Sequence, residues 1–106
     1  MSSLNVDIAL SRILAVVVSN DTLSVELEDG RAISVPLPWF PRLQFGTSQE
    51  RNNWRLIGGG EGIHWPDLDE DVSAEDLIVG RRSMESLKSL KKWQQKRKTG
   101  DPDHEK

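Results

Sequence analysis

Polar and apolar residues alternate without a break over residues 22–28, TLSVELE, and Asp29-Gly30 follows them directly. Three apolar side chains then share one face: Leu23, Val25 and Leu27. Such alternation is typical of a strand with one buried face, and Asp-Gly is a strong signal for a tight hairpin turn. The alternation resumes over residues 31–37, and residues 12–19 are rich in the β-branched side chains that suit a strand. We therefore predict a three-stranded antiparallel meander over residues 12–37.

Three prolines end this meander, because proline donates no hydrogen bond to a sheet: Pro36, Pro38 and Pro41. Downstream, Thr47–Glu50 (TSQE) has the pattern of a capping box and predicts a short helix over residues 48–54. Ser73–Asp76 (SAED) repeats that pattern and predicts a second short helix that ends at Gly80.

Two further extended segments, residues 54–57 and 63–65, flank a glycine-rich turn. With the meander they predict the α+β class: an antiparallel sheet made of the meander and one or two further strands, short helices, and a basic C-terminal helix. We assign residues 1–80 to this domain, and residues 81–106 to a basic helical tail that ends in a disordered C-terminus.

The chain has four tryptophans and no tyrosine. Trp39 and Trp65 each lie near a proline among apolar neighbours, so we expect both to be mostly buried. Four apolar residues recur at every third position of the tail: Met84, Leu87, Leu90 and Trp93. This narrow stripe predicts a helix that is only loosely docked on the domain, with Trp93 as its anchor or as a contact with a partner.

Charge divides the chain into three parts. The body, residues 1–80, has five arginines against thirteen carboxylates, whereas residues 81–98 have eight Lys and Arg against Glu85 alone. A short acidic end brings the total to −3. This asymmetry is typical of an interaction tail, or of a tail that pairs with its own domain. A solvated helix that keeps a small domain soluble is the simpler interpretation.

The residue inventory excludes several classes of site. There are no cysteines, which rules out disulfides, zinc–thiolate sites and cysteine nucleophiles. The longest apolar run, residues 13–18, is too short to span a membrane and lacks the flanking features of a secretory signal. We therefore expect a cytoplasmic protein without membrane association.

Three patterns that could carry chemistry are incomplete. The glycines of residues 58–62 lack the lysine of a phosphate-binding loop, and the aspartates of residues 67–71 lack the glycine and glutamate of a calcium loop. His64 has no nucleophile beside it that the sequence can show. We expect no enzymatic activity, no metal site and no cofactor; a hydrolase that uses His64 is a minor alternative.

Two stretches of one-signed charge are the candidate binding sites. Residues 61–76 hold seven carboxylates and no basic residue, which suits a basic partner or the chain's own tail. The candidate partner contacts here are Glu61, His64, Trp65, Asp67, Asp69, Glu70 and Asp71. The second set, for a partner or a nucleic acid, is Arg81, Arg82, Lys88, Lys91, Lys92, Trp93, Lys96, Arg97 and Lys98.

Several strings of the chain resemble the bacterial family DUF2442, a domain of unknown function. They are EDGR at 28–31, WFPRL at 39–43, ERNNW at 50–54 and IHWP followed by LDEDV within 63–72. The resemblance spans residues 12–80 and implies a small α+β domain with an antiparallel sheet. It also implies pairing in the genome with a small protein of the DUF4160 type, in an arrangement similar to toxin–antitoxin modules. Some family members carry a helix-turn-helix domain, but residues 81–98 are too short for one, and the family offers no catalytic residues to carry over.

Our leading hypothesis is a small, non-catalytic, cytoplasmic interaction protein that acts like an antitoxin and binds a small partner protein, encoded by an adjacent gene. The alternative is a nucleic-acid-binding or regulatory protein that uses the basic helix, whose affinity would depend strongly on salt. The acidic body weighs against the alternative, because it would repel a duplex.

Overall fold

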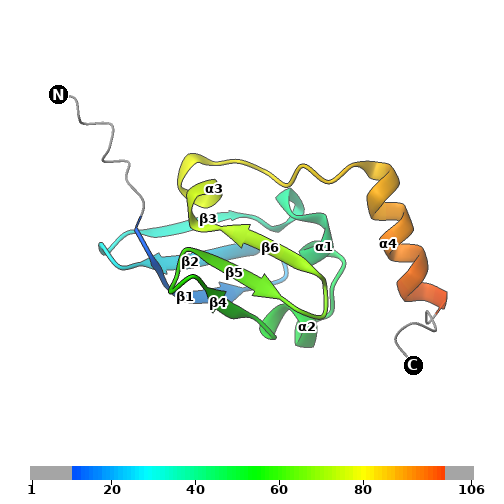
Figure 1. Ribbon diagram of the computed structural model, residues 1–106, viewed down its shortest axis with the longest axis horizontal. Coiled ribbons are helices and arrows are strands. Elements are labelled where there is room, and N and C mark those ends of the chain that lie inside the picture. The colour runs from blue at the N-terminus through cyan, green and yellow to red at the C-terminus, as the bar shows by residue number, and fades with distance from the viewer. Residues whose placement is uncertain (1–10, 100–106) are drawn as a thin grey trace.

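The computed structural model describes residues 11–99, which form two small antiparallel sheets, short helices and a longer C-terminal helix (Figure 1). The strands are β1 (Ile13–Val18), β2 (Thr22–Leu27), β3 (Ala32–Pro36), β4 (Arg55–Ile57), β5 (Gly62–Trp65) and β6 (Glu70–Ser73). The α-helices are α1 (Pro41–Gln44), α2 (Ser48–Asn52), α3 (Ala74–Val79) and α4 (Leu87–Thr99), and a 3-10 turn covers Leu37–Trp39. The α+β class is confirmed. No helix of the described part is long and apolar enough to cross a membrane.

The predicted meander is confirmed as the sheet β1-β2-β3. Its central strand β2 pairs antiparallel with both neighbours, and the apolar face identified from the alternation is buried: Leu23, Val25 and Leu27. The tight turn between β2 and β3 contains Gly30 at φ +96°, a conformation that glycine adopts readily. The alternation of polar and apolar residues therefore predicted the buried face of this sheet correctly.

We expected the remaining strands to extend the meander, and this was wrong. They form a second sheet in the order β4-β5-β6. Strand β6 was missed, because it presents a single apolar residue, Val72, among acidic ones. Val72 lies opposite Ile63 of β5, and both are fully or almost fully buried.

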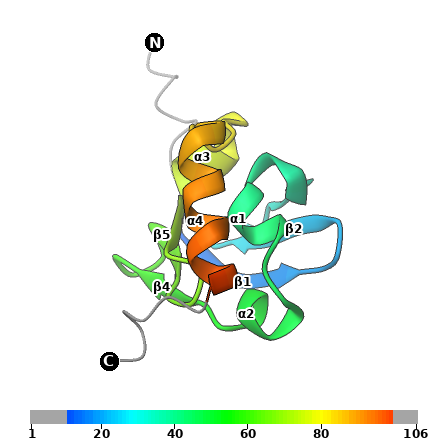
Figure 2. The same cartoon turned by 90° about the vertical axis from the view of Figure 1, so that its right-hand side faces the viewer.

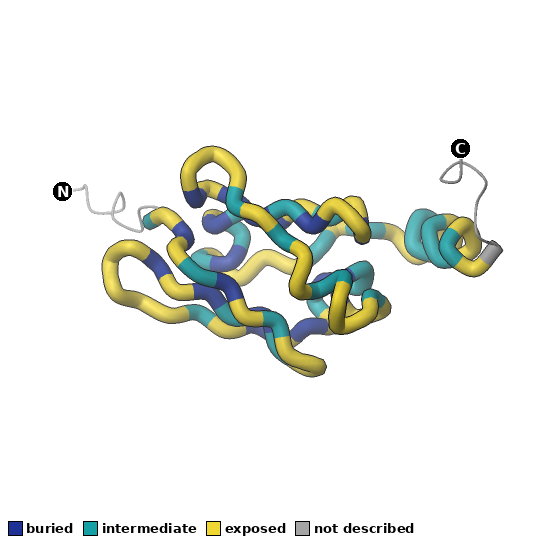
Figure 3. Tube along the Cα trace, turned by 90° about the horizontal axis from the view of Figure 1, so that it is seen from below, coloured by how far each residue is buried: buried dark blue, intermediate teal, exposed yellow. Residues whose placement is uncertain are grey.

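Both sheets contribute to a single core, shown by the buried segments in Figure 3. Trp65 of β5 is fully buried, as predicted, and its indole Nε1 donates to the carbonyl of Arg51 at 2.9 Å. Trp39 is mostly buried and packs against the core, although less completely than Trp65. Its ring packs against the core on one side, and the guanidinium of Arg82 lies over it at 4.9 Å.

Side-chain caps define the short helices. Thr47 and Glu50 form a complete capping box at α2, as predicted, and α2 ends at Asn52. Ser73 caps α3 by accepting from the backbone of Asp76, and Gly80 ends it in the left-handed conformation at φ +79°. The predicted boundaries of these two helices are therefore correct within about two residues.

The tail helix begins later than predicted. Residues 81–86 cross the surface without regular structure, and α4 starts at Leu87. Ser86 sets this start, because its hydroxyl accepts from the backbone N–H of Ser89 at 3.0 Å. The predicted disordered C-terminus lies outside the described residues.

The turn between β4 and β5 joins the second sheet to the first. The Gly60 carbonyl accepts from the N–H of Ile13 at 2.8 Å, and Arg12 donates to the carbonyls of Gly58 and Gly59. A Cβ at Gly60 would lie 2.8 Å from the Ile13 carbonyl oxygen, so glycine permits this close approach. The glycine cluster thus has a structural role at the junction of the two sheets.

Gly60→Ala is expected to destabilise the domain more than Gly30→Ala. Both glycines have positive φ, but a Cβ at Gly30 would meet nothing within 4 Å. We expect about 1–2 kcal/mol for Gly30→Ala from backbone strain, and a further 1–3 kcal/mol or so for Gly60→Ala from the clash. Urea unfolding of the two variants measures this difference. Equal losses would show that the turn can move away from β1.

Candidate interaction surfaces

Arg42 of α1 joins the tail to the domain. Its Nε and Nη2 donate to the two carboxylate oxygens of Glu85 at 2.8 and 2.7 Å, and Nη1 donates to the carbonyl of Asp69 at 3.1 Å. Both side chains of the ion pair are largely buried, with 15% and 9% of their surface exposed. Hydrogen bonds from Arg42 lower the pKa of Glu85, and those to Glu85 raise the pKa of Arg42. The segment that leads into α4 is thereby held on α1 and on the β5–β6 turn.

A second ion pair holds the other end of α4. Arg97 donates through Nη1 and Nη2 to the two oxygens of Glu50, at 3.1 and 2.8 Å. Oε1 of Glu50 also accepts from the backbone N–H of Thr47 in the capping box of α2. These bonds, those from Arg97 first, lower the pKa of Glu50. One carboxylate therefore both caps α2 and docks α4.

Trp93 lies between the two ion pairs and is the docking anchor of α4. The guanidinium carbons of Arg42 and Arg97 lie 5.1 and 4.7 Å from its ring centroid, which is within the range of cation–π attraction. Figure 2 shows α4 lying across the end of the domain. Of the two roles considered for Trp93, the structure supports docking.

Glu70, at the start of β6, lies near this arrangement. Burial raises its pKa to about 7, although the positive charge of Arg42 acts in the opposite direction. The carboxylates of Glu85 and Asp71 raise it further. Glu70 is thus a half-buried group that titrates near neutral pH beside the ion pair that holds the tail.

The acidic stretch 61–76 does not form one surface, because strands β5 and β6 carry its residues to opposite ends of the sheet. Asp67, Asp69 and Glu70 lie at the β5–β6 turn, where Asp67 accepts from Asn53 and Asp69 faces Arg42 at 3.5 Å. Trp65 is fully buried, so its assignment as a partner contact was wrong: it is a core residue.

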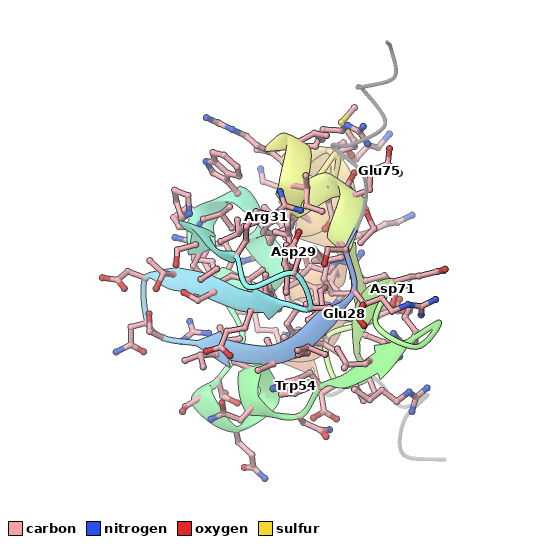
Figure 4. All side chains as sticks on the ribbon, turned by 90° about the vertical axis from the view of Figure 1, so that its left-hand side faces the viewer. Glu28, Asp29, Arg31, Trp54, Asp71 and Glu75 are labelled. Atoms are coloured by element: carbon pink, nitrogen blue, oxygen red, sulfur yellow. The ribbon has the colours of Figure 1, made fainter. Side chains whose placement is uncertain are left out.

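A different set of carboxylates gathers at the other end, and we call it the acidic face: Glu28, Asp29, Glu61, Asp71 and Glu75. Backbone hydrogen bonds bring these segments together. Ala74 N–H donates to the Glu61 carbonyl, Glu28 N–H to the Arg12 carbonyl, and Asp29 N–H to the Ser11 hydroxyl. Figure 4 shows four of the five side chains on this side of the molecule. The structure thus adds Glu28 and Asp29, from the β2–β3 turn, to the predicted acidic set.

Three residues of the acidic face, Glu61, Asp71 and Glu75, line two adjoining hollows of about 480 and 280 Å³, which share Glu61 and Ser73 in their walls. Arg12 lines the larger hollow, but its guanidinium is turned to the glycine carbonyls of the β4–β5 turn. Glu75 also contributes a 3.6 Å ion pair to Arg81. Asp29 is paired with Arg31 at 2.8 Å. The surface is therefore shallow and concave, and its five carboxylates outnumber the three arginines beside them: Arg12, Arg31 and Arg81.

His64 is paired across the second sheet with Asp71, and its Nδ1 lies 2.6 Å from the carboxylate. Asp67, Asp69 and Asp71 have separate partners, and residues 11–99 contain no group of three His, Asp or Glu side chains that could hold a metal ion. His64 therefore makes a cross-strand contact that joins β5 to β6.

The predicted basic set divides into docking and outward-facing residues. Arg81 pairs with Asp76 at 2.7 Å, Arg82 covers Trp39, and Trp93 and Arg97 dock α4. The remaining members are exposed lysines: Lys88, Lys91, Lys92, Lys96 and Lys98.

Three residues of the docking arrangement were not anticipated: Arg42, Glu50 and Glu85. Glu85 could have been noticed, because it is the single carboxylate in the basic segment 81–98. Its partner Arg42 is 43 positions away, and no local pattern reveals such a pair.

Glu70→Gln is expected to stabilise the domain at alkaline pH. The raised pKa means that the native state keeps a proton that the unfolded chain loses above about pH 4.5. Glu70 therefore lowers stability progressively as the pH rises from 4.5 to about 7, and the full loss persists above that range. The neutral glutamine avoids this loss, so we expect a gain on the order of 2 kcal/mol at about pH 8 and none near pH 4.

Urea unfolding at several pH values measures this effect, with the exposed Glu26→Gln as control. A Glu70→Gln difference that does not change with pH would contradict the raised pKa.

Comparison with known proteins agrees with this architecture. A crystal structure of a protein of unknown function from Rhodospirillum rubrum ATCC 11170 has a similar fold, with a TM-score of 0.62 and 24% sequence identity. The match covers 73% of this chain and 95% of that chain. No curated protein matches the chain. Residues 13–83 match the family described as "Protein of unknown function (DUF2442)". Since this match covers more than half of the chain, the protein belongs to the DUF2442 family.

Proposed function

We propose that this protein is a non-catalytic binding module whose acidic face receives a basic segment of a small partner protein. The observation that carries the proposal is the gathering of five carboxylates from the β2–β3 turn, the β4–β5 turn, β6 and α3 on one side of the domain. Three of them, Glu61, Asp71 and Glu75, line two adjoining hollows. Fixed carboxylates of one sign attract a cationic partner and exclude anionic ones.

The position of the tail supports this proposal. Helix α4, the most positively charged element of the chain, is docked through the Arg97–Glu50 and Glu85–Arg42 ion pairs, at the end of the domain away from the acidic face (Figure 1). Arg81 reaches the edge of the acidic face through Glu75 and Asp76, but the lysines of α4 do not take part in those pairs. The acidic face is therefore presented to an external cation.

The partner we propose is the small DUF4160-type protein that the family resemblance implies, encoded by an adjacent gene, in an antitoxin-like pair. The surface suits lysine and arginine side chains, because the hollows are shallow and their rims carry carboxylates. Rim charges of this kind govern the association rate and its salt dependence.

The test is a calorimetric titration of the full chain with the purified product of the neighbouring gene, which measures the affinity of the complex. Glu28→Gln/Glu61→Gln should weaken binding by about tenfold and reduce its dependence on salt. The control Asp21→Asn/Asp67→Asn removes the same charge from residues outside the acidic face, and it should bind like the parent chain. Each asparagine retains an oxygen that can accept the hydrogen bonds of these aspartates.

Two results would refute the proposal. One is the absence of a complex with a neighbouring protein that is itself folded. The other is an equal loss of affinity in both double variants, which would show that net charge, and not the acidic face, governs binding.

A further inference from the structure

Helix α4 presents two chemically different faces. The half-buried residues form its docking face: Ser89, Leu90, Trp93, Gln94 and Arg97. The exposed residues on its other side form what we call the lysine face: Lys88, Lys91, Lys92, Gln95, Lys96 and Lys98. At 100° per residue these six side chains occupy one continuous side of the helix. In Figure 3, α4 carries exposed and intermediate residues but no buried one.

Helix α4 carries more positive charge than a helix needs for solubility alone. Residues 87–99 hold six basic residues and no acidic one, whereas a solvated surface helix ordinarily mixes both signs. Like charges at i and i+4, such as Lys88, Lys92 and Lys96, destabilise a helix slightly. An external anion would relieve this repulsion.

A groove of about 800 Å³ runs along the lysine face beside the domain. Its walls include five cations and one carboxylate: Arg42, Lys88, Lys91, Lys92, Lys96 and Asp69. The concave shape and the concentrated positive charge coincide, and such a combination raises the local concentration of anions.

The chemistry of the lysine face distinguishes between anionic partners. Protein interfaces depend on clusters of apolar or aromatic anchors and are depleted in lysine, but the lysine face has only the exposed Leu87 beside its first turn and Trp93 in the wall of the groove. Membrane insertion needs a row of apolar side chains on the exposed surface of the helix, whereas Leu90 and Trp93 of α4 lie on its docking face and Leu87 stands alone. By contrast, lysine and glutamine side chains commonly donate hydrogen bonds to phosphate oxygens in complexes with nucleic acids.

We propose that the lysine face of α4 and the adjoining groove bind the phosphate backbone of nucleic acid, without reading its sequence. From Lys88 to Lys98 the helix rises about 15 Å, which spans roughly four phosphates of one DNA strand. The ion pairs of Arg42 and Arg97, with Trp93 between them, hold the lysine face outward.

The acidic body no longer weighs against such binding. Five of its carboxylates gather on the acidic face, at the end of the domain away from α4 (Figures 1 and 4), and Glu50 beside α4 is paired with Arg97. Exposed charges separated by more than about 8 Å are largely screened at physiological salt. Asp69 is the carboxylate that lines the groove, and it faces Arg42.

The test uses the full chain and a fluorescein-labelled DNA duplex of about 20 base pairs, with fluorescence anisotropy measured at increasing salt. Lys88→Gln/Lys92→Gln should weaken binding by on the order of tenfold and lower the slope of log affinity against log salt by about 2. Arg31→Gln/Arg55→Gln removes two positive charges away from α4 and should leave the slope unchanged. Circular dichroism checks that α4 remains helical, which glutamine favours.

Several outcomes would overturn the proposal. These are an absence of binding by the parent chain at about 50 mM salt, or equal losses in the lysine and arginine double variants. Equal affinity for polyglutamate, or for phosphatidylserine vesicles, would assign the groove to another anion. The acidic-face variant Glu28→Gln/Glu61→Gln should still bind the duplex, so failure here is distinguishable from failure of the proposed protein-binding function.

Discussion

The guanidinium of Arg42 connects three parts of the chain that are distant in sequence: α1, the β5–β6 turn and the segment that leads into α4. A largely buried charge is tolerated only when its hydrogen bonds are satisfied, and here Glu85 and the carbonyl of Asp69 accept them while the ring of Trp93 lies against the cation. Loss of either partner would leave an uncompensated charge in a poorly hydrated site. The pair therefore works as a positional constraint on the tail more than as a source of net stability.

This constraint separates the opposite charges of the molecule. A flexible basic tail on an acidic body would be free to collapse onto the nearest carboxylates. Instead, Arg42 and Glu50 of the domain hold the tail at one end, while Glu61, Asp71 and Glu75 gather at the other. Two surfaces of opposite sign can then bind different partners without competing, and the two proposed functions are compatible in one small molecule.

Glu70 places a titratable group next to the same constraint. Its carboxylate is half-buried beside Arg42, and Glu85 and Asp71 contribute further negative charge nearby. Near neutral pH the proton on Glu70 sets how much negative charge surrounds the Arg42 guanidinium. Protonation therefore changes the electrostatic balance at the junction between the domain and α4 without altering any atom of the ion pair.

The sequence by itself determined the elements whose signals are local. Alternation over residues 22–28 identified the buried face of β2, Asp29-Gly30 its turn, and Thr47 and Glu50 the start of α2. Each of these signals acts between residues a few positions apart, where backbone geometry alone brings the groups together. The family resemblance and the division of charge along the chain were also legible at this level.

The tertiary structure alone decided what depends on distant residues. β6 exists because Val72 lies opposite Ile63, the acidic stretch is divided because β5 and β6 run in opposite directions, and α4 is docked through pairs 43 and 47 positions apart. Glu28 and Asp29 join the acidic face only because Ser11 and Arg12 lie beside the β2–β3 turn. Contacts of this kind form when segments distant in sequence come together around the core. The residues that make them follow no repeating pattern in the sequence, so the sequence does not reveal them.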